Sequence, residues 1–403
     1  MKILHINFSD QEDDSAFLAL RLMEAGGEEA HLWVKEKHSK HSKVMEIRRR
    51  WLALLLIYCD RLLNKLFRVT LFSNLSVLYP LNGTYRFFKK LKIYQEADIV
   101  HLHSVYHNFF DLDSLLKICR EKKVVWTMHA MWCMTGGETF VFLDHGYQKG
   151  DANTPFASEY PLRNPLIDYR QRFLIKKRDI YAKATPNLTI VPTSKWLEKS
   201  FLKSFVYHPD IHTSVIYNAV NTKQFKNLNQ RYWSQVRILF IHQKDEFSGY
   251  HLFEKIVDDI THPFDLFLVG KSLKCKHPFT TLPAYQGDSE RLNDILNSVD
   301  ILVYPVEAAN FPLLPLQAMA TGVYVLAANV GGIPEQFRTN ARGLFQYSNA
   351  NDLLDKLQDT LAMGLNKIRE KGVQNEEYVQ NNFNEFKMVR QYKDLYKEIL
   401  YKS

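Results

Sequence analysis

Short apolar, β-branched runs alternate along this chain with longer stretches in which apolar residues recur at helical spacing. In the C-terminal half, residues 301–304 and 323–328 are such runs, and residues 313–321 between them are mostly good helix formers. Pro315 fits the first turn of a helix, and Gly322 is a usual helix stop. Strand, helix and strand in this order predict a βαβ unit with a parallel sheet.

The same alternation extends over nearly the whole chain and predicts an α/β protein. Further strands are predicted at residues 2–8, 31–34, 97–103, 124–128, 188–192, 237–242 and 264–269. Further helices are predicted at residues 15–25, 115–121, 292–298 and 383–401, and from about 195 and 250. Residues 138 to about 173 show few periodic features and predict a long loop or lid. At 403 residues, the chain exceeds one typical core, so we expect two domains.

A ligand site is predicted at the carboxyl ends of the parallel strands. Residues 307–313 and the Gly331-Gly332 turn should lie side by side there. The backbone amides of Leu313 and Leu314, at a helix start, can bind an anion such as a diphosphate. Gly331 and Gly332 lack side chains, which lets a ligand approach the backbone. The alternative is a plain βαβ unit whose glycines only make turns.

Residues 301–335 resemble the signature region of the family-4 retaining glycosyltransferases, in which a loop PS-x-E-E-N-F-P leads to EAMA-x-G-x-P-V. The residues in register are Pro305, Asn310, Phe311, Pro312, Ala318, Met319, Gly322, Val325, Gly331, Gly332, Pro334 and Glu335. In that family two glutamates, separated by seven residues, frame the donor sugar nucleotide. Here Ala309 and Gln317 take their places. The resemblance implies that Gln317 binds the ribose and that Glu307, the nearest carboxylate, acts at the sugar.

Residues 97–137 resemble the capsule and lipopolysaccharide branch of the same family, which has WTLHDMW followed by TGG. The matching residues are Thr127, His129, Met131, Trp132, Thr135, Gly136 and Gly137, with Ala130 in place of the aspartate. The resemblance implies that His129, at a strand's carboxyl end, positions the donor sugar.

Two further loops bear on the diphosphate. After residues 237–242 the family supplies an arginine and a lysine, where this chain has Gln243 and Ser248, with Lys244 the nearest cation. Lys271 follows the next strand, where the base usually lies, and either supplies positive charge or is simply solvated. After the first strand, the acidic residues 9–14 replace the family's glycine pair and disfavour a phosphate there.

The resemblance implies the GT-B fold: two facing doubly wound, Rossmann-like α/β domains with a cleft between them and a C-terminal crossover helix. We expect an acceptor domain at residues 1–218, a nucleotide-sugar domain at 219–382, and a helix at 383–403 that returns to the first domain. The implied activity is retaining transfer of a hexose from a nucleotide-diphosphate sugar to a glycan or lipid-linked acceptor of a surface polysaccharide, capsule or lipopolysaccharide. The fold type generally manages without a metal, and we expect no cofactor.

Charge and composition favour an anionic partner. The chain has 46% hydrophobic residues and a net charge of +8, and its four cysteines show no paired spacing, which fits a reducing cytoplasm. No apolar run reaches the ~18 residues of a membrane span. Residues 38–72 are basic with an apolar middle, and Arg48, Arg49 and Arg50 precede leucines at helical spacing. Residues 48–72 are either an amphipathic helix lying at the inner face of an anionic membrane or a helical hairpin packed on the first domain.

Three rival functions differ from this reading. The substituted positions Ala130, Ala309, Gln317, Gln243 and Ser248 suit a non-catalytic scaffold or partner subunit in polysaccharide assembly. An NAD-binding Rossmann enzyme would need a G-x-G-x-x-G run after its first strand, where this chain has none. A nucleic-acid partner is not indicated, because the positive charge is organised on no recognised module.

Overall fold

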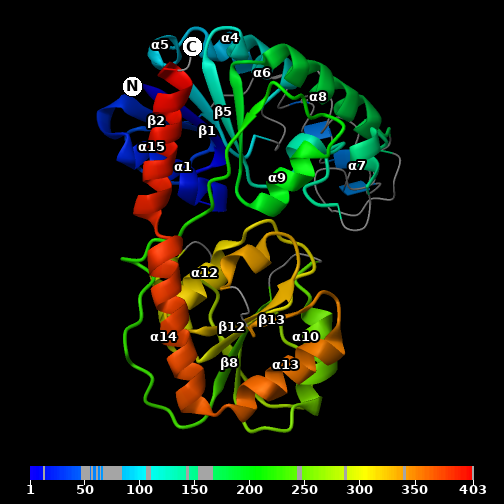
Figure 1. Ribbon diagram of the computed structural model, residues 1–403, viewed down its shortest axis with the longest axis vertical. Coiled ribbons are helices and arrows are strands. Elements are labelled where there is room, and N and C mark those ends of the chain that lie inside the picture. The colour runs from blue at the N-terminus through cyan, green and yellow to red at the C-terminus, as the bar shows by residue number, and fades with distance from the viewer. Residues whose placement is uncertain are drawn as a thin grey trace. The chain divides into compact units, whose positions relative to one another are not determined.

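The computed structural model of the protein (Figure 1) consists of two α/β units that share one chain. It describes residues 1–11, 14–46, 55, 58–59, 62–63, 65–66, 84–105, 110–141, 145–152, 167–242, 247–285, 288–338 and 342–401. The first unit comprises Met1–Ile216 and Val389–Ser403, and the second comprises Tyr217–Met388. The predicted α/β fold class, with two Rossmann-like units, is confirmed.

The first unit is built on a parallel seven-stranded sheet with the strand order β3-β2-β1-β4-β5-β6-β7. Its strands are β1 (Ile3–Ser9), β2 (Ala30–Glu36), β3 (Val44–Glu46), β4 (Ile99–Leu102), β5 (Lys123–Met128), β6 (Leu188–Pro192) and β7 (His212–Thr213). Its described helices are α1 (Asp14–Ala25), η1 (Gly27–Glu29), α4 (Thr84–Phe88), α5 (Lys92–Glu96), α6 (Leu112–Cys119), η2 (Met131–Met134), α7 (Gly146–Lys149), α8 (Arg170–Ala184) and α9 (Lys195–Leu202). The order reverses between β1 and β4, which places a topological switch point there.

The second unit repeats this design with a parallel six-stranded sheet in the order β10-β9-β8-β11-β12-β13. Its strands are β8 (Arg237–His242), β9 (Asp265–Gly270), β10 (Phe279–Leu282), β11 (Ile301–Tyr304), β12 (Tyr324–Asn329) and β13 (Leu344–Gln346). Its helices are α10 (Tyr250–Ile256), η3 (Val257–Asp259), α11 (Ser289–Asn297), α12 (Leu313–Ala320), η4 (Ile333–Gln336), α13 (Ala350–Ala362) and α14 (Leu365–Asn382). Helices α12 and α14 pack together against β12, and α10 and α13 form another pair (Figure 1).

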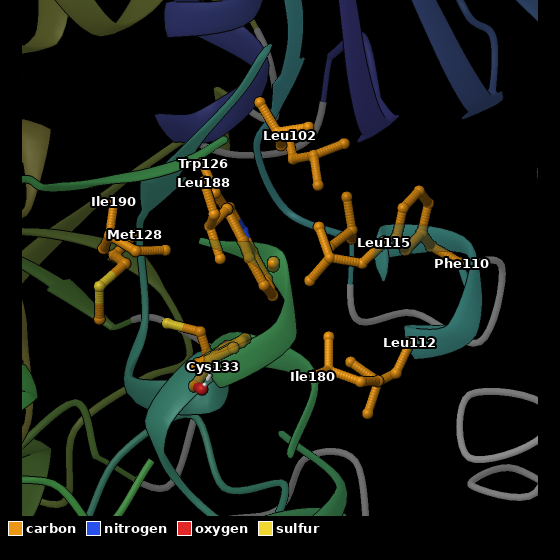
Figure 2. Close-up of a cluster of buried hydrophobic side chains, with 14 of the residues drawn as sticks. Leu102, Phe110, Leu112, Leu115, Trp126, Met128, Cys133, Ile180, Leu188 and Ile190 are labelled. Atoms are coloured by element: carbon orange, nitrogen blue, oxygen red, sulfur yellow. Dashed lines mark hydrogen bonds between the residues drawn. The ribbon is translucent and has the colours of Figure 1, made fainter. Parts of the chain in front are cut away.

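The core of the first unit lies between its sheet and the helices α6, α8 and α9. Figure 2 shows part of this core, in which Trp126 of β5 lies among aliphatic side chains from β4, β6 and α6. Ile180 of α8 and Cys133 of η2 lie at its lower edge. Helix α8 therefore buries one face against the loop that follows β5.

Helix α15 (Glu385–Tyr401) supplies the last element of the first unit. Tyr392 and Tyr396 are fully buried. The Tyr392 hydroxyl lies 2.8 Å from Thr127 Oγ1, and the Tyr396 hydroxyl lies 2.6 Å from His101 Nδ1. At the start of the helix Phe386 is 59% exposed, whereas Met388 is buried.

The sequence analysis did not predict α8, and it did not predict α13 or α14 either. A loop was expected to about residue 173, whereas the helix begins at Arg170 and runs for 15 residues. Its buried face carries Arg170 and Lys177 beside Phe173, Leu174 and Tyr181, so apolar residues do not trace a helical stripe. Helix α6 also begins earlier than predicted, at Leu112, because Asp111 accepts a hydrogen bond from the Ser114 amide as its N-cap.

The structural division of the chain falls between Ile216 and Tyr217, two residues before the boundary expected from the sequence. Along the parts of the chain that the structure describes, no helix combines the length and apolar character required to cross a membrane.

Candidate functional site

The second unit has its switch point between β8 and β11, and the loops after these two strands are in contact. The Glu307 amide donates to the Phe247 carbonyl at 2.8 Å. Gly249 has φ +64°, and a Cβ there would lie 1.7 Å from the Pro305 carbonyl oxygen. Only glycine permits this close approach, so the two loops pack directly against each other. Their contact lies at the position where parallel α/β sheets bind ligands.

Buried side chains hold residues 307–312 in place through hydrogen bonds to the loop backbone. Asn218 Nδ2 donates to the Phe311 carbonyl at 3.1 Å, and Gln336 Nε2 donates to the Pro312 carbonyl at 2.6 Å. The Phe311 ring is buried and lies 5.1 Å from the ring of Tyr217. Asn310 is buried as well. Phe311 therefore anchors the loop from its inner side.

The predicted neighbourhood of this loop and the Gly331-Gly332 turn is present in the structure. Gly331 has φ +58°, and a Cβ there would lie 1.8 Å from the Ala309 carbonyl oxygen. Because Gly331 has no side chain, its backbone can contact the 307–312 loop. The sequence analysis had expected this glycine to give a ligand access to the backbone. Gly332 precedes η4 and is buried.

Helix α12 begins directly after this loop, with Pro312 as its N-cap. The side chains of Leu313 and Leu314 are buried, while Gln317 is half-buried one turn further on. The positive end of the helix dipole lies at the carboxyl edge of the sheet, where it favours an anion.

The candidate lysines, Lys244 and Lys271, and the replaced cation positions, Gln243 and Ser248, differ in burial and in whether the structure describes them. Lys271 follows β9 directly and is exposed. Ser248 is buried, with its hydroxyl unpaired in the part of the chain that the structure describes. Gln243 and Lys244 lie outside the described residues.

Glu307 is paired with a residue that the sequence did not suggest. Its Oε1 lies 3.3 Å from Nε2 of His251, in the first turn of α10. The carboxylate side chain retains 19% exposure at the edge of the switch point. No motif marks His251, since the pairing depends on how α10 starts after Gly249. Glu335 accepts a hydrogen bond from the Tyr217 hydroxyl at 2.9 Å.

His129 lies in the first unit, directly after β5, where its sheet ends. Both ring nitrogens are buried. Burial lowers the pKa of His129 to about 3, so the ring is neutral at physiological pH. A neutral imidazole can donate one hydrogen bond and accept another.

Three more buried histidines lie beside it on β1 and at the end of β4. His5 Nδ1 lies 3.3 Å from His103 Nε2, and one nitrogen from each of His5, His101 and His103 lies within 4.8 Å of the others. This spacing could suit a metal ion. However, both nitrogens of His101 are engaged, with Tyr396 and with Thr127 Oγ1 at 2.8 Å. Coordination by all three histidines would require one of these hydrogen bonds to break.

Comparison with known proteins finds a family match within the second unit. Residues 235–377 match the family model described as glycosyl transferases group 1. Over 313 residues, the chain is 22% identical to an Escherichia coli K12 protein that bears the name of a colanic acid biosynthesis glycosyl transferase, WcaC. That alignment covers 72% of this chain and 71% of the relative. A protein in the cps region of Klebsiella pneumoniae is 24% identical over 330 residues, covering 77% of this chain and 81% of the relative.

The fold resembles solved structures over nearly its whole length. A glycosyltransferase from Rickettsia africae matches with a TM-score of 0.63 and 15% identity, covering all of this chain and 99% of that one. A crystal structure of Anabaena HepE in complex with UDP and glucose matches with a TM-score of 0.67 and 13% identity. The match covers 99% of this chain and all of that one. At this identity the likeness concerns the fold, which is that of the GT-B type.

Proposed function

We propose that this chain, whose residues 235–377 match the group 1 glycosyl transferase model, transfers a hexose from a nucleotide-diphosphate sugar to a glycan or lipid-linked acceptor, with retention of configuration. The product is a bacterial surface polysaccharide of the capsule or lipopolysaccharide kind. The colanic acid name of one relative and the cps location of another support this class of product.

The observation that carries the proposal is the built switch point of the second unit. There the glycine contacts at Gly249 and Gly331 hold two loops against the start of α12, at the edge of the sheet where nucleotides bind. We infer that the donor is a uridine or guanosine diphosphate sugar. The UDP and glucose bound to HepE support a donor of this kind.

We assign a role in the reaction to each of these groups and to His129 of the first unit. The α12 amides of Leu313 and Leu314 meet the diphosphate, and Lys271 and Lys244 supply positive charge. Gln317 binds the ribose as a neutral replacement for glutamate. Glu307 stabilises the positive charge that develops on the sugar, and His129 orients the sugar hydroxyls. No metal or cofactor is part of this scheme.

We propose that the protein meets its acceptor at the inner face of the cell membrane. Most of residues 48–72, including Arg48, Arg49 and Arg50, lie outside the described residues. Four residues that are described there as helical, Leu55, Tyr58, Leu62 and Leu66, are between 46% and 66% exposed. In the sequence, their spacing of three and four residues is typical of one helix face. An exposed apolar face beside basic residues supports contact with an anionic bilayer.

The experiment is a calorimetric titration of the purified protein with a panel of nucleoside diphosphates and their sugars. We expect one uridine or guanosine diphosphate to bind. Gln317→Ala should weaken that binding by about 1 kcal/mol, or roughly fivefold, because one neutral hydrogen bond is lost. Gln380→Ala, on the exposed face of α14, is the control and should bind like the wild type.

Two results would count against the proposal. If no nucleoside diphosphate binds at millimolar concentration, the protein has no donor site, and the scaffold function is favoured. If the product sugar carries the opposite anomeric configuration to the donor, by proton coupling in NMR spectra, the retaining mechanism is wrong.

A further inference from the structure

Helix α8 buries three polar side chains against the loop of residues 129–138, which we call the His129 loop. Arg170, Lys177 and Tyr181 are 4%, 0% and 0% exposed. Their spacing of seven and four residues places them on one face of the helix. Buried lysine is rare because desolvation of its charge is costly, so its contacts require an explanation.

Lys177 binds the backbone of the loop at two points. Its Nζ donates to the carbonyl of Trp132 and, at 2.9 Å, to the carbonyl of Thr135. The same nitrogen lies 3.8 Å from the centre of the Trp132 ring, a distance typical of a cation–π contact. One side chain thus spans the turn between η2 and the Thr135-Gly136-Gly137 segment.

The neighbours of Lys177 on α8 strengthen this attachment. The Tyr181 hydroxyl donates to the Cys133 carbonyl at 2.7 Å, and Arg170 Nη1 donates to Glu138 Oε1 at 3.2 Å. A Cβ on Gly136 would lie 2.8 Å from Cβ of Arg170, so the loop backbone rests directly on the helix. The groups facing the ammonium from the loop are the Cys133 thiol and the Glu138 carboxylate, and both favour its charged form.

We propose that Lys177 is a positioning residue that fixes the His129 loop in the geometry needed for sugar transfer. The proposal rests on the proposed function, in which His129 orients the sugar hydroxyls. Lys177 lies behind this loop and acts through its backbone, without touching the donor or the acceptor.

The test compares Lys177→Met, which keeps the length of the side chain but removes its donors, with Lys183→Met on the exposed face of the same helix. Hydrogen exchange is measured at the amides of Met131 and Gly137, which donate within the loop to the Thr139 carbonyl and to Thr135 Oγ1. In Lys177→Met we expect exchange at both amides to accelerate about tenfold or more while the amides of β5 stay protected. Lys183→Met should match the wild type.

Steady-state kinetics separate positioning from a merely structural role. For Lys177→Met we expect kcat to fall on the order of 10- to 100-fold, because small displacements of substrate-orienting groups are costly, while the KM of the donor stays within about twofold. Tyr181→Phe, which removes one hydroxyl alone, should show the same pattern with a smaller loss. It keeps the test informative if Lys177→Met folds poorly.

A pH series adds an independent readout. Burial lowers the pKa of Lys177 to about 7, so the charge on its nitrogen is lost as the pH rises through this value. The loop of the wild type and of Lys183→Met should therefore show a rise in exchange near pH 7 beyond intrinsic base catalysis, and Lys177→Met should show intrinsic base catalysis alone.

Unchanged exchange in Lys177→Met overturns the proposal, whether or not the protein transfers sugar. Faster exchange with unchanged kcat confines the lysine to stability and also overturns it. Absence of transfer by the wild type contradicts the proposed function instead, and the exchange measurement keeps the two failures apart.

Discussion

At the scale of single residues, the site departs mainly in charge from the family pattern that it resembles. Ala309 and Gln317 occupy the places where the resembling family has glutamates, and Glu307 is the carboxylate that remains. The structure directs Glu307 toward His251 of α10, at 3.3 Å. A carboxylate held in this way has a defined direction before any donor binds.

Glu307→Gln should lower kcat by on the order of 10²- to 10³-fold while nucleotide affinity changes little, because the carboxylate acts on charge that develops only in the transition state. Initial rates and calorimetry with the same donor measure the two effects. Glu254→Gln, on the same helix as His251, is the matched control and should keep wild-type activity. Full activity of Glu307→Gln would remove Glu307 from the mechanism.

The sequence predicted the local structure around these residues but not their long-range partners, for physical reasons. Local signals were visible: the apolar runs of residues 237–242 and 301–304 indicated strands, and Gly322 indicated the end of a helix. The partners of Glu307 and Glu335 were not visible, because each depends on a side chain far away in the chain.

At the scale of elements, β1, β4 and β5 carry four buried histidines to one place in the first unit. Burial lowers the pKa of His5 and of His129 to about 3, and that of His101 and His103 well below the usual value. In the unfolded chain these rings bind protons near pH 6.5. The folded state therefore loses stability as the pH falls from about 6.5 toward 3, because only the unfolded chain takes up the protons.

We expect the thermal midpoint of the first unit to fall steadily between pH 7 and pH 4. His5→Leu should give a shallower fall, since one group that titrates only on unfolding has been removed. Differential scanning calorimetry across this pH range measures both slopes. An equally steep fall in His5→Leu would show that His5 does not contribute to the acid sensitivity.

Helix α15 is joined to the same region through its tyrosine hydroxyls. Tyr392→Phe and Tyr396→Phe should each lower the free energy of opening of the first unit by about 1 to 3 kcal/mol, because each removes a buried hydrogen bond and leaves a partner unsatisfied. Native-state hydrogen exchange of the β4 and β5 amides gives this free energy. Tyr401→Phe, at a residue that is 85% exposed, is the control and should have no effect.

The basic segment of residues 48–72 gives a prediction of its own. The protein should bind anionic vesicles more strongly than neutral ones, and added salt should weaken the binding. Changing Arg48, Arg49 and Arg50 together to glutamate should abolish it, as a vesicle flotation assay would show. Equal binding to neutral and anionic vesicles, or no binding to either, would contradict membrane contact through charge.

Helix α8 marks the limit of pattern-based prediction at this scale. Strands such as β8 and β11 were predicted at their observed bounds, because residues buried on both faces leave a continuous apolar run. Helix α8 instead buries a lysine and an arginine that bind the loop beneath them, so the apolar stripe that predicts a helix is interrupted.

At the scale of the whole molecule, the chain order and the alternation of strands and helices were enough to predict two parallel α/β units. The order of strands within each sheet follows from general rules of connection, with the reversal next to β1 and next to β8. The donor, the acceptor and the linkage depend on a few side chains at these reversals, and they form no pattern along the chain.

The first unit is built from two separate segments of the chain, and this affects its folding during synthesis. The ribosome synthesises residues 1–216 first and then the 172 residues of the second unit, Tyr217–Met388. Only then does α15, the last helix of the first unit, emerge. At ~5–20 residues per second, the nascent first unit waits roughly 9–35 seconds without Tyr392 and Tyr396. During that interval the buried faces of β4 and β5 lack their final cover. The newborn chain should therefore rely on ribosome-associated chaperones more than a protein whose first domain is continuous.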